Sequence, residues 1–290
     1  MWKLPRPIEH SDFNERARMK ELNDYEKNEL AEIEKWANEE PGVVGKTVGV
    51  LLEPLVWTAQ KAIPQAAIEG ALTATNKAAE MLSDTSDIIR DGKVDSIEDL
   101  RTKDLQLSDQ LADTVHNWAI GVAMAEGTGT GVVGLPGLVA DIPLLITWSL
   151  RTINKIGLCY GYESKTEADR RFVFGIMAAA GSNTMKEKAA AMVFLRQIQV
   201  ALIQKTWKVL AEEAAAKKLG EAALIMAIKH LAKQLGVNIT KRAALKIIPV
   251  VGGVVGGAVN GAFIRDIGWA ARRSFQKRWL MENKKIPLER

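Results

Sequence analysis

The sequence predicts an all-α protein, built as a single large helical domain with a glycine-rich helical hairpin at its core. The chain has 290 residues, of which 47% are hydrophobic and 26% charged, as in an ordinary folded protein. Ala, Leu, Lys and Glu dominate many windows and β-branched alternation is rare, which favours helix over strand. Two glycine-rich segments with almost no charge, 128–150 and 247–264, supply the expected hairpin.

The expected domain covers residues 23–282, between an N-terminal extension, 1–22, and a tail, 283–290. The first helix has a clear start, because Asn23 can cap it and Glu26 stands at the capping-box position. It is expected to end at Pro41-Gly42. Residues 83–110 are expected to form a connecting loop with a short helix at 96–101.

Further helices are expected from proline and glycine breaks and from capping residues. Ser108 would cap a helix that runs to about Glu126, and Ser164 with Glu167 would open a helix to about Gly181. The other expected helices cover residues 43–61, 64–82, 142–158, 183–217, 219–235, 239–248 and 251–282.

Asp141 is the one charged residue between Thr128 and Leu150. The glycines and Pro136 within 127–137 predict a loop, and Pro143 predicts an early helical position, so Asp141 is expected to cap helix 142–158. Two alternatives remain open for this carboxylate. It could form a buried ion pair with Arg151, Lys155 or Arg265, or it could act directly in function.

Neither of two glycine motifs supports nucleotide binding. Gly129-Thr-Gly-Val-Val-Gly134 matches G-x-G-x-x-G, but a helix rather than a strand precedes it. Gly45-Lys46-Thr47 lacks the first glycine of a P-loop, because position 40 is Glu40.

Nothing in the sequence indicates a metal site, a cofactor or a catalytic residue. The three histidines have no partner at metal-ligand spacing. His116, beside Trp118 on an expected helix, is most simply a hydrogen-bonded core residue. The lone Cys159 fits a reducing cytosol, and the N-terminus shows no secretory signal.

The glycines of segment 247–264 fall at small-x-x-x-small spacing, which lets another helix approach closely. The pairs that provide this spacing are formed by Gly252, Gly253, Gly256, Gly257 and Gly261. The continuation is cationic and aromatic, and residues 265–290 carry 8 Lys/Arg against 3 Asp/Glu. This pattern predicts a membrane interface formed by Trp269, Arg272, Arg273, Phe275, Lys277, Arg278 and Trp279. The alternative is a tightly packed internal hairpin with a solvated basic end.

Three motifs in order resemble the EcsC protein family over almost the whole chain. The N-terminal motif is Tyr25-Glu26 with Glu32–Trp36, and the central one is Gly134–Leu145 with Leu150–Ile153 and Cys159–Tyr162. The C-terminal motif comprises Ile248–Gly252, Asn260, Arg265-Asp266 and Gly268–Arg273. The family is named for a protein encoded beside the two components of an ABC transport system, and it provides no catalytic residues. The resemblance implies a bacterial, cytoplasmic-side and membrane-linked setting.

The leading hypothesis is therefore a non-enzymatic helical protein that associates peripherally with the cytoplasmic face of the membrane. Its expected partners are anionic lipid and a membrane transport component. The sequence does not give an oligomeric state. The second hypothesis is an enzyme for an apolar or lipid-like substrate, with a pocket at Asp141, Arg151, Tyr160 and Arg265. The third is a protein–protein interaction module. Nucleic-acid binding is disfavoured, since the basic end comes with no recognition module.

Overall fold

A computed structural model describes residues 19–41, 69–70, 72–73, 84–130, 135–208 and 252–288. Within these ranges all regular structure is helical and no strand occurs, so the all-α prediction is confirmed. The predicted helices 43–61, 219–235 and 239–248 lie outside the described residues, as does most of 64–82.

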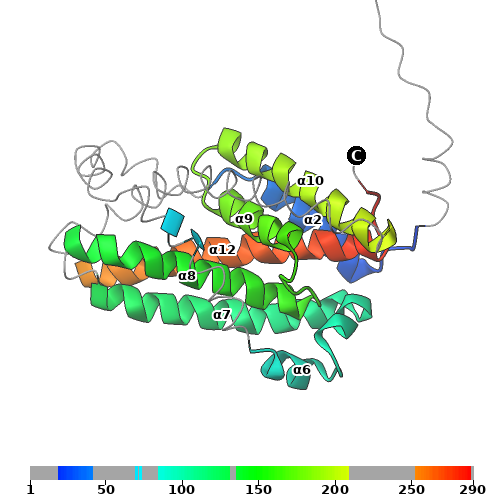
Figure 1. Ribbon diagram of the computed structural model, residues 1–290, viewed down its shortest axis with the longest axis horizontal. Helices are drawn as coiled ribbons and strands as arrows, with labels where there is room; N and C mark the ends of the chain where they lie inside the picture. Colours follow the sequence, from blue (N-terminus) through cyan, green and yellow to red (C-terminus); the bar gives the residue numbers. More distant parts are fainter. Residues whose placement is uncertain are drawn as a thin grey trace, which may run out of the picture.

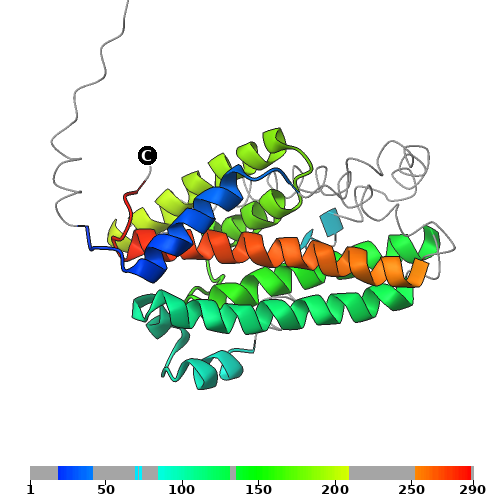
Figure 2. The same cartoon turned by 180° about the vertical axis from the view of Figure 1, so that it is seen from behind.

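Three long helices form the body of the molecule (Figure 1). They are α7 (Leu105–Thr130), α8 (Leu135–Cys159) and α12 (Gly252–Glu282). Helix α12 packs along α7 and also contacts α8, and α7 packs against α8. The end of α7 and the starts of α8 and α12 lie together at one end of this bundle in both views (Figures 1 and 2).

Shorter helices cover the other half of α12. Helices α2 (Asp24–Asn38) and α9 (Glu167–Ala180) both contact α12, and α10 (Met185–Lys208) packs on α9. Helix α6 (Ser86–Gly92) and the 3₁₀ helix η2 (Ile97–Thr102) lie beside the start of α7. The short helix expected at 96–101 is thus confirmed, whereas α6 was not predicted.

Local capping chemistry explains where several helices begin. Asn23 accepts a hydrogen bond from the Glu26 amide at 2.8 Å, and the Glu26 carboxylate accepts one from the Asn23 amide, as predicted. The capping box of α9 is instead formed by Thr166 and Asp169, two residues after the predicted pair Ser164 and Glu167. The prediction for Ser108 is also wrong, because α7 begins at Leu105 and buries Ser108 inside it.

Of the predicted loop at 127–137, residues 127–130 and 135–137 are helical, and 131–134 lie outside the described residues. Helix α7 continues to Thr130 and α8 begins at Leu135, so Asp141 lies inside α8 and cannot be its N-cap. Pro136 stands in the first turn of α8, where the missing N–H costs nothing. Pro143 is an interior helical residue, tolerated here against the usual preference.

Glycines of α12 permit a close approach to α7. A Cβ on Gly261 would lie 2.4 Å from the Cγ of Met124, and a Cβ on Gly268 would lie 2.1 Å from the Cδ2 of His116. Gly257 is buried, but its packing and that of Gly252, Gly253 and Gly256 remain predictions. Gly268 was not among the predicted packing residues, although it follows Gly261 by two helical turns.

We expect Gly268→Ala to destabilise the protein by about 1–3 kcal/mol, since the rigid His116 ring must move to admit the methyl group. Gly121→Ala on α7 is the matched control, because a Cβ there meets nothing within 4 Å. Alanine's better helix propensity should make that variant more stable by up to about 1 kcal/mol. Urea unfolding followed by circular dichroism measures both. Equal stability of the two variants would contradict the close approach.

Candidate functional site

The cationic and aromatic stretch of α12 lies in the interior of the protein. Phe275 is 2% exposed, and Arg272, Arg273, Arg278 and Trp279 are buried as well. The prediction that these five residues form a membrane interface is therefore wrong for this fold. Of the predicted set, Trp269 is partly exposed and Lys277 is half-buried.

Carboxylates from three other helices pair with the three buried arginines. Arg272 donates to Asp113 of α7 at 2.7 Å, and Arg273 donates to Glu29 of α2. Arg278 pairs with Asp169 of α9 at 3.3 Å and with Glu282 of its own helix at 2.9 Å. A buried guanidinium is tolerated where its charge is paired and hydrogen-bonded, and these contacts supply both.

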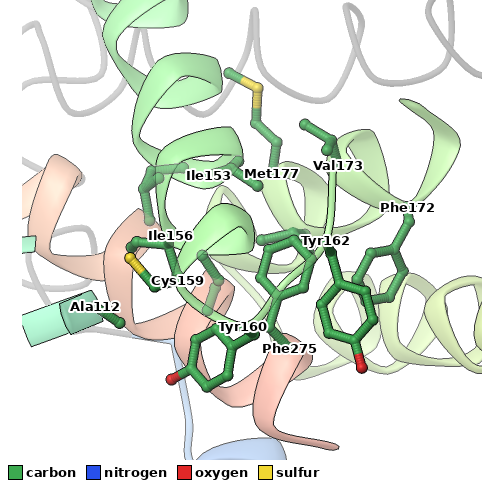
Figure 3. Close-up of a cluster of buried hydrophobic side chains, with 14 of the residues drawn as sticks. Ala112, Ile153, Ile156, Cys159, Tyr160, Tyr162, Phe172, Val173, Met177 and Phe275 are labelled. Atoms are coloured by element: carbon green, nitrogen blue, oxygen red, sulfur yellow. The ribbon is translucent and has the colours of Figure 1, made fainter. Parts of the chain in front are cut away.

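Phe275 lies at the centre of an aromatic cluster (Figure 3). Its ring stacks on Tyr160 and Tyr162, with centroids 6.1 Å and 5.8 Å away, and meets Phe172 edge-on at 5.3 Å. Gly157 of α8 faces the same ring, and a Cβ there would lie 2.7 Å from the Phe275 Cζ. Phe275, one of the three aromatic residues predicted for the membrane interface, is thus a core residue.

A polar cluster joins four helices around Asp109 at the start of α7. Its carboxylate accepts hydrogen bonds from Tyr25 at 2.7 Å, from Gln276 at 2.8 Å and from Tyr160. Burial raises the pKa of Asp109, and burial also raises the pKa of Tyr160. Since all three groups are bonded to Asp109 and Tyr160 is fully buried, the cluster fixes α2, α7, α12 and the end of α8 together.

The four residues of the predicted pocket have different surroundings. Tyr160 donates its hydroxyl to Asp109 in the core, whereas Arg151 lies over two tryptophan rings. Arg265 pairs with Asp266 at 3.1 Å. The side chain of Asp141 lies outside the described residues, so an ion pair involving it remains a prediction. The ion pair of Lys155 is with Asp87, at 2.6 Å.

A cleft of about 390 Å³ lies between α2 and α12. Trp36 and Trp269 contribute to its walls, and Ala179 and Ala180 line it from α9. Lys188, only 4% exposed, also lines it and donates to the backbone carbonyls of Trp36 and Glu39, the latter at 2.8 Å. Burial lowers the pKa of Lys188. The remaining lining residues are Glu32, Lys35, Glu39, Glu40, Pro41, Arg265, Asp266 and Arg273.

Charge is distributed unevenly along the three long helices. Three stretches of these helices meet at one end of the bundle, namely 119–130, 135–150 and 252–264. Their only ionisable residues are Glu126 and Asp141. We call this part the uncharged end. Two tryptophans lie where this end meets the charged part of the bundle. Trp118 is 54% exposed, and Trp269 contacts His116, which precedes Trp118 by two residues.

Trp118 of α7 and Trp148 of α8 lie side by side at this boundary, with ring centroids 5.9 Å apart. Arg151 completes the group, with its Cζ 5.5 Å and 5.1 Å from the two ring centroids. We call these three residues the boundary cluster. Arg151 was predicted to lie in a pocket, and no role was predicted for the contact between the two tryptophans, because this contact joins two helices.

The fold and its sites define an all-helical protein with a buried polar half and an uncharged end. The chain belongs to the EcsC protein family, whose model matches residues 27–280, so the resemblance noted from the motifs is confirmed. Among curated proteins it is similar to "Uncharacterized protein YdbA" of Bacillus subtilis (strain 168), with 25% identity over 191 residues, 66% of this chain and 65% of that protein. It is also similar to "Protein EcsC" of the same strain, with 26% identity over 161 residues, 56% of this chain and 59% of that protein. The chain thus spans less than two thirds of the length of either relative, and no solved structure matches it.

Within the described part of the chain, no helix combines the length and the apolar character needed to cross a bilayer. The same part contains no group of three or more His, Cys, Asp or Glu side chains arranged to hold a metal ion.

His116 is a buried core residue, as expected, and its Nε2 lies 3.0 Å from the Arg265 carbonyl oxygen. Burial and the nearby charge of Arg272 lower its pKa to about 4 from 6.5. Because the folded protein disfavours the protonated ring, His116 stabilises the fold above pH 6.5. That contribution, about 3 kcal/mol, should be lost as the pH falls from 6.5 to about 4.

His116→Gln isolates this effect, since glutamine can still donate to the carbonyl but does not titrate. We expect the free energy of unfolding of the wild type to fall relative to that of the variant between pH 6.5 and 4. The contribution of Asp109 is common to both proteins and cancels in the difference. Parallel pH profiles in chemical denaturation would contradict the assignment.

Proposed function

We propose that the protein is a non-enzymatic peripheral membrane protein that inserts its uncharged end into the cytoplasmic leaflet. The observation that carries the proposal is the segregation of charge along α7, α8 and α12. The proposed membrane surface therefore differs from the predicted one, because the fold buries Arg272, Arg273, Phe275, Arg278 and Trp279. The family supports a setting near a membrane transport system, and a component of such a system is the protein partner we infer.

The dimensions of the uncharged end suit one leaflet. At 1.5 Å per residue, the uncharged stretch 252–264 is about 20 Å long and the stretch 119–130 about 18 Å long. The hydrocarbon core of a bilayer is about 30 Å thick, so such an end would reach roughly to its middle. Tryptophans concentrate at membrane–water interfaces, where Trp118, Trp148 and Trp269 would then lie.

Exposed apolar side chains on the described part of this end support the same orientation. Leu144, on the first half of α8, is 48% exposed, and Met124 on α7 is 46% exposed. Helices that insert into an interface do so through side chains of this kind.

Leu144→Glu should weaken binding to anionic vesicles by about tenfold, because a carboxylate replaces an apolar side chain at the inserted surface. Val193→Glu is the matched control, since Val193 is similarly exposed but lies on α10, away from the uncharged end. Flotation with phosphatidylglycerol-containing vesicles at low salt measures both variants. If the wild type does not float, or if both variants bind equally well, the proposed insertion is wrong.

A second candidate function is the binding of a small anionic or zwitterionic molecule in the cleft between α2 and α12. Lys188 favours it, because an ammonium group has three donors and the two carbonyls occupy two of them. Two tryptophan rings with a few converging polar groups are typical of a small-molecule site. Of the residues predicted for the pocket of the enzyme hypothesis, Arg265 lines this cleft.

Binding in the cleft should raise the melting temperature of the wild type in a thermal-shift screen of carboxylates, phosphate esters and amino acids. Lys188→Met should abolish the shift for any compound found, whereas Lys186→Met should retain it. Lys186 is exposed on the same helix, two residues earlier, which makes it a matched control. A screen without a hit, or a shift that persists in Lys188→Met, would exclude this role for the cleft.

A further inference from the structure

The boundary cluster holds a guanidinium group over two indole rings at the surface of the protein. Both distances from the Arg151 Cζ to the ring centroids, 5.5 Å and 5.1 Å, are within the range of a cation–π contact. Trp118 is more than half exposed and Trp148 half-buried, so the cluster remains open to a ligand.

Within the described part of the chain, Arg151 has no carboxylate at ion-pair distance. Lys155, one turn further along α8, differs because it pairs with Asp87 and donates to the Asp84 backbone. A guanidinium group over an aromatic face still has its edge N–H donors free, and these match the oxygens of a phosphate in bidentate geometry.

The order of side chains along one face of α8 indicates where such a phosphate would come from. Leu144, Trp148 and Arg151 follow at i, i+4 and i+7, which places them on one stripe of the helix. Passing out of the uncharged end, the stripe changes from apolar to aromatic to cationic over about 10 Å. A membrane presents the same sequence of environments, from acyl chains through the interface to the headgroups.

We propose that Arg151, held by Trp118 and Trp148, binds the phosphodiester of an anionic lipid headgroup when the uncharged end is inserted. The inference rests on the proposed membrane association and names the residue that selects the lipid. The rings fix the orientation of the guanidinium group, so fewer side-chain rotamers are lost on binding.

The test compares the full-length wild type with Arg151→Gln, Arg151→Lys and Lys186→Gln. Binding is measured by flotation with vesicles of phosphatidylcholine alone and of phosphatidylcholine with phosphatidylglycerol. Lys186→Gln removes an exposed cation on α10 and so matches the change in net charge. Thermal unfolding of each variant shows that the fold is retained at the assay temperature.

Arg151→Gln should lose about fivefold in affinity for phosphatidylglycerol vesicles, while Lys186→Gln should bind like the wild type. Arg151→Lys should recover only part of the loss, because an ammonium group cannot bind the phosphate in bidentate fashion. On phosphatidylcholine alone, where choline already neutralises the phosphate, Arg151→Gln and the wild type should bind equally.

The inference and the proposed function fail in different ways. If the wild type binds vesicles and Arg151→Gln matches Lys186→Gln, the Arg151 inference is overturned and membrane association stands. An equal loss on both vesicle types would also overturn it, because Arg151 would then act through packing. If the wild type floats with no vesicle but inorganic phosphate raises its melting temperature and not that of Arg151→Gln, the ligand is soluble phosphate and both proposals fail.

Discussion

The arrangement of helices depends on the pairing of the buried cations of α12. Arg272, Arg273 and Arg278 each meet a carboxylate on a different helix, namely α7, α2 and α9. An unpaired charge in this interior would cost several kcal/mol, so a rotation or shift of any of these helices that broke its pair would be strongly opposed. The ion pairs therefore specify the register of three helices on α12, whether or not each one adds net stability.

The placement of these pairs explains the uncharged end. All three lie on the second half of α12, where α2 and α9 cover it, whereas the first half has no ionisable residue between Gly252 and Ile264. In that first half, α12 is held against α7 by close packing, because Gly261 lets α12 approach the Met124 side chain. One half of the bundle is thus held by charge pairing, and the half with the uncharged end is held by shape. In the helix stretches of that end, Glu126 and Asp141 are the only ionisable residues that would oppose entry into lipid.

Local chemistry was readable from the sequence in part, since the caps at Ser108 and Ser164 were misplaced, whereas distant pairing was not readable. The Asn23–Glu26 capping box, the course of α12 and the burial of His116 were predicted, since each follows from spacing within a few residues or from burial preference. The cations of α12 were misassigned to a membrane surface because their partners lie far away in sequence. Arg272 is separated by 159 residues from Asp113, and Arg273 by 244 from Glu29.

The sites show both a local and a long-range limit. Asp141 was misassigned as a cap because Pro143 is normally excluded from a helix interior, and only the fold shows that α8 accepts it. The stripe of Leu144, Trp148 and Arg151 was visible at helical spacing. The sequence did not show that Trp118 packs against this stripe, because Trp118 lies on another helix.

In the described part of the chain, arginines lie over tryptophan rings at two places, which show how a structural cation differs from one available to a ligand. Arg272 and Arg273 lie over Trp269, at 4.5 Å and 5.0 Å from its ring centroid, and each is also paired with a carboxylate. Arg151 makes the same aromatic contact, but in the described part of the chain no carboxylate pairs with it. Residue type and aromatic neighbours are therefore insufficient to identify a membrane-facing cation. The presence of a carboxylate partner distinguishes the cases, and for this reason the proposed headgroup contact is assigned to Arg151 of α8 rather than to a cation of α12.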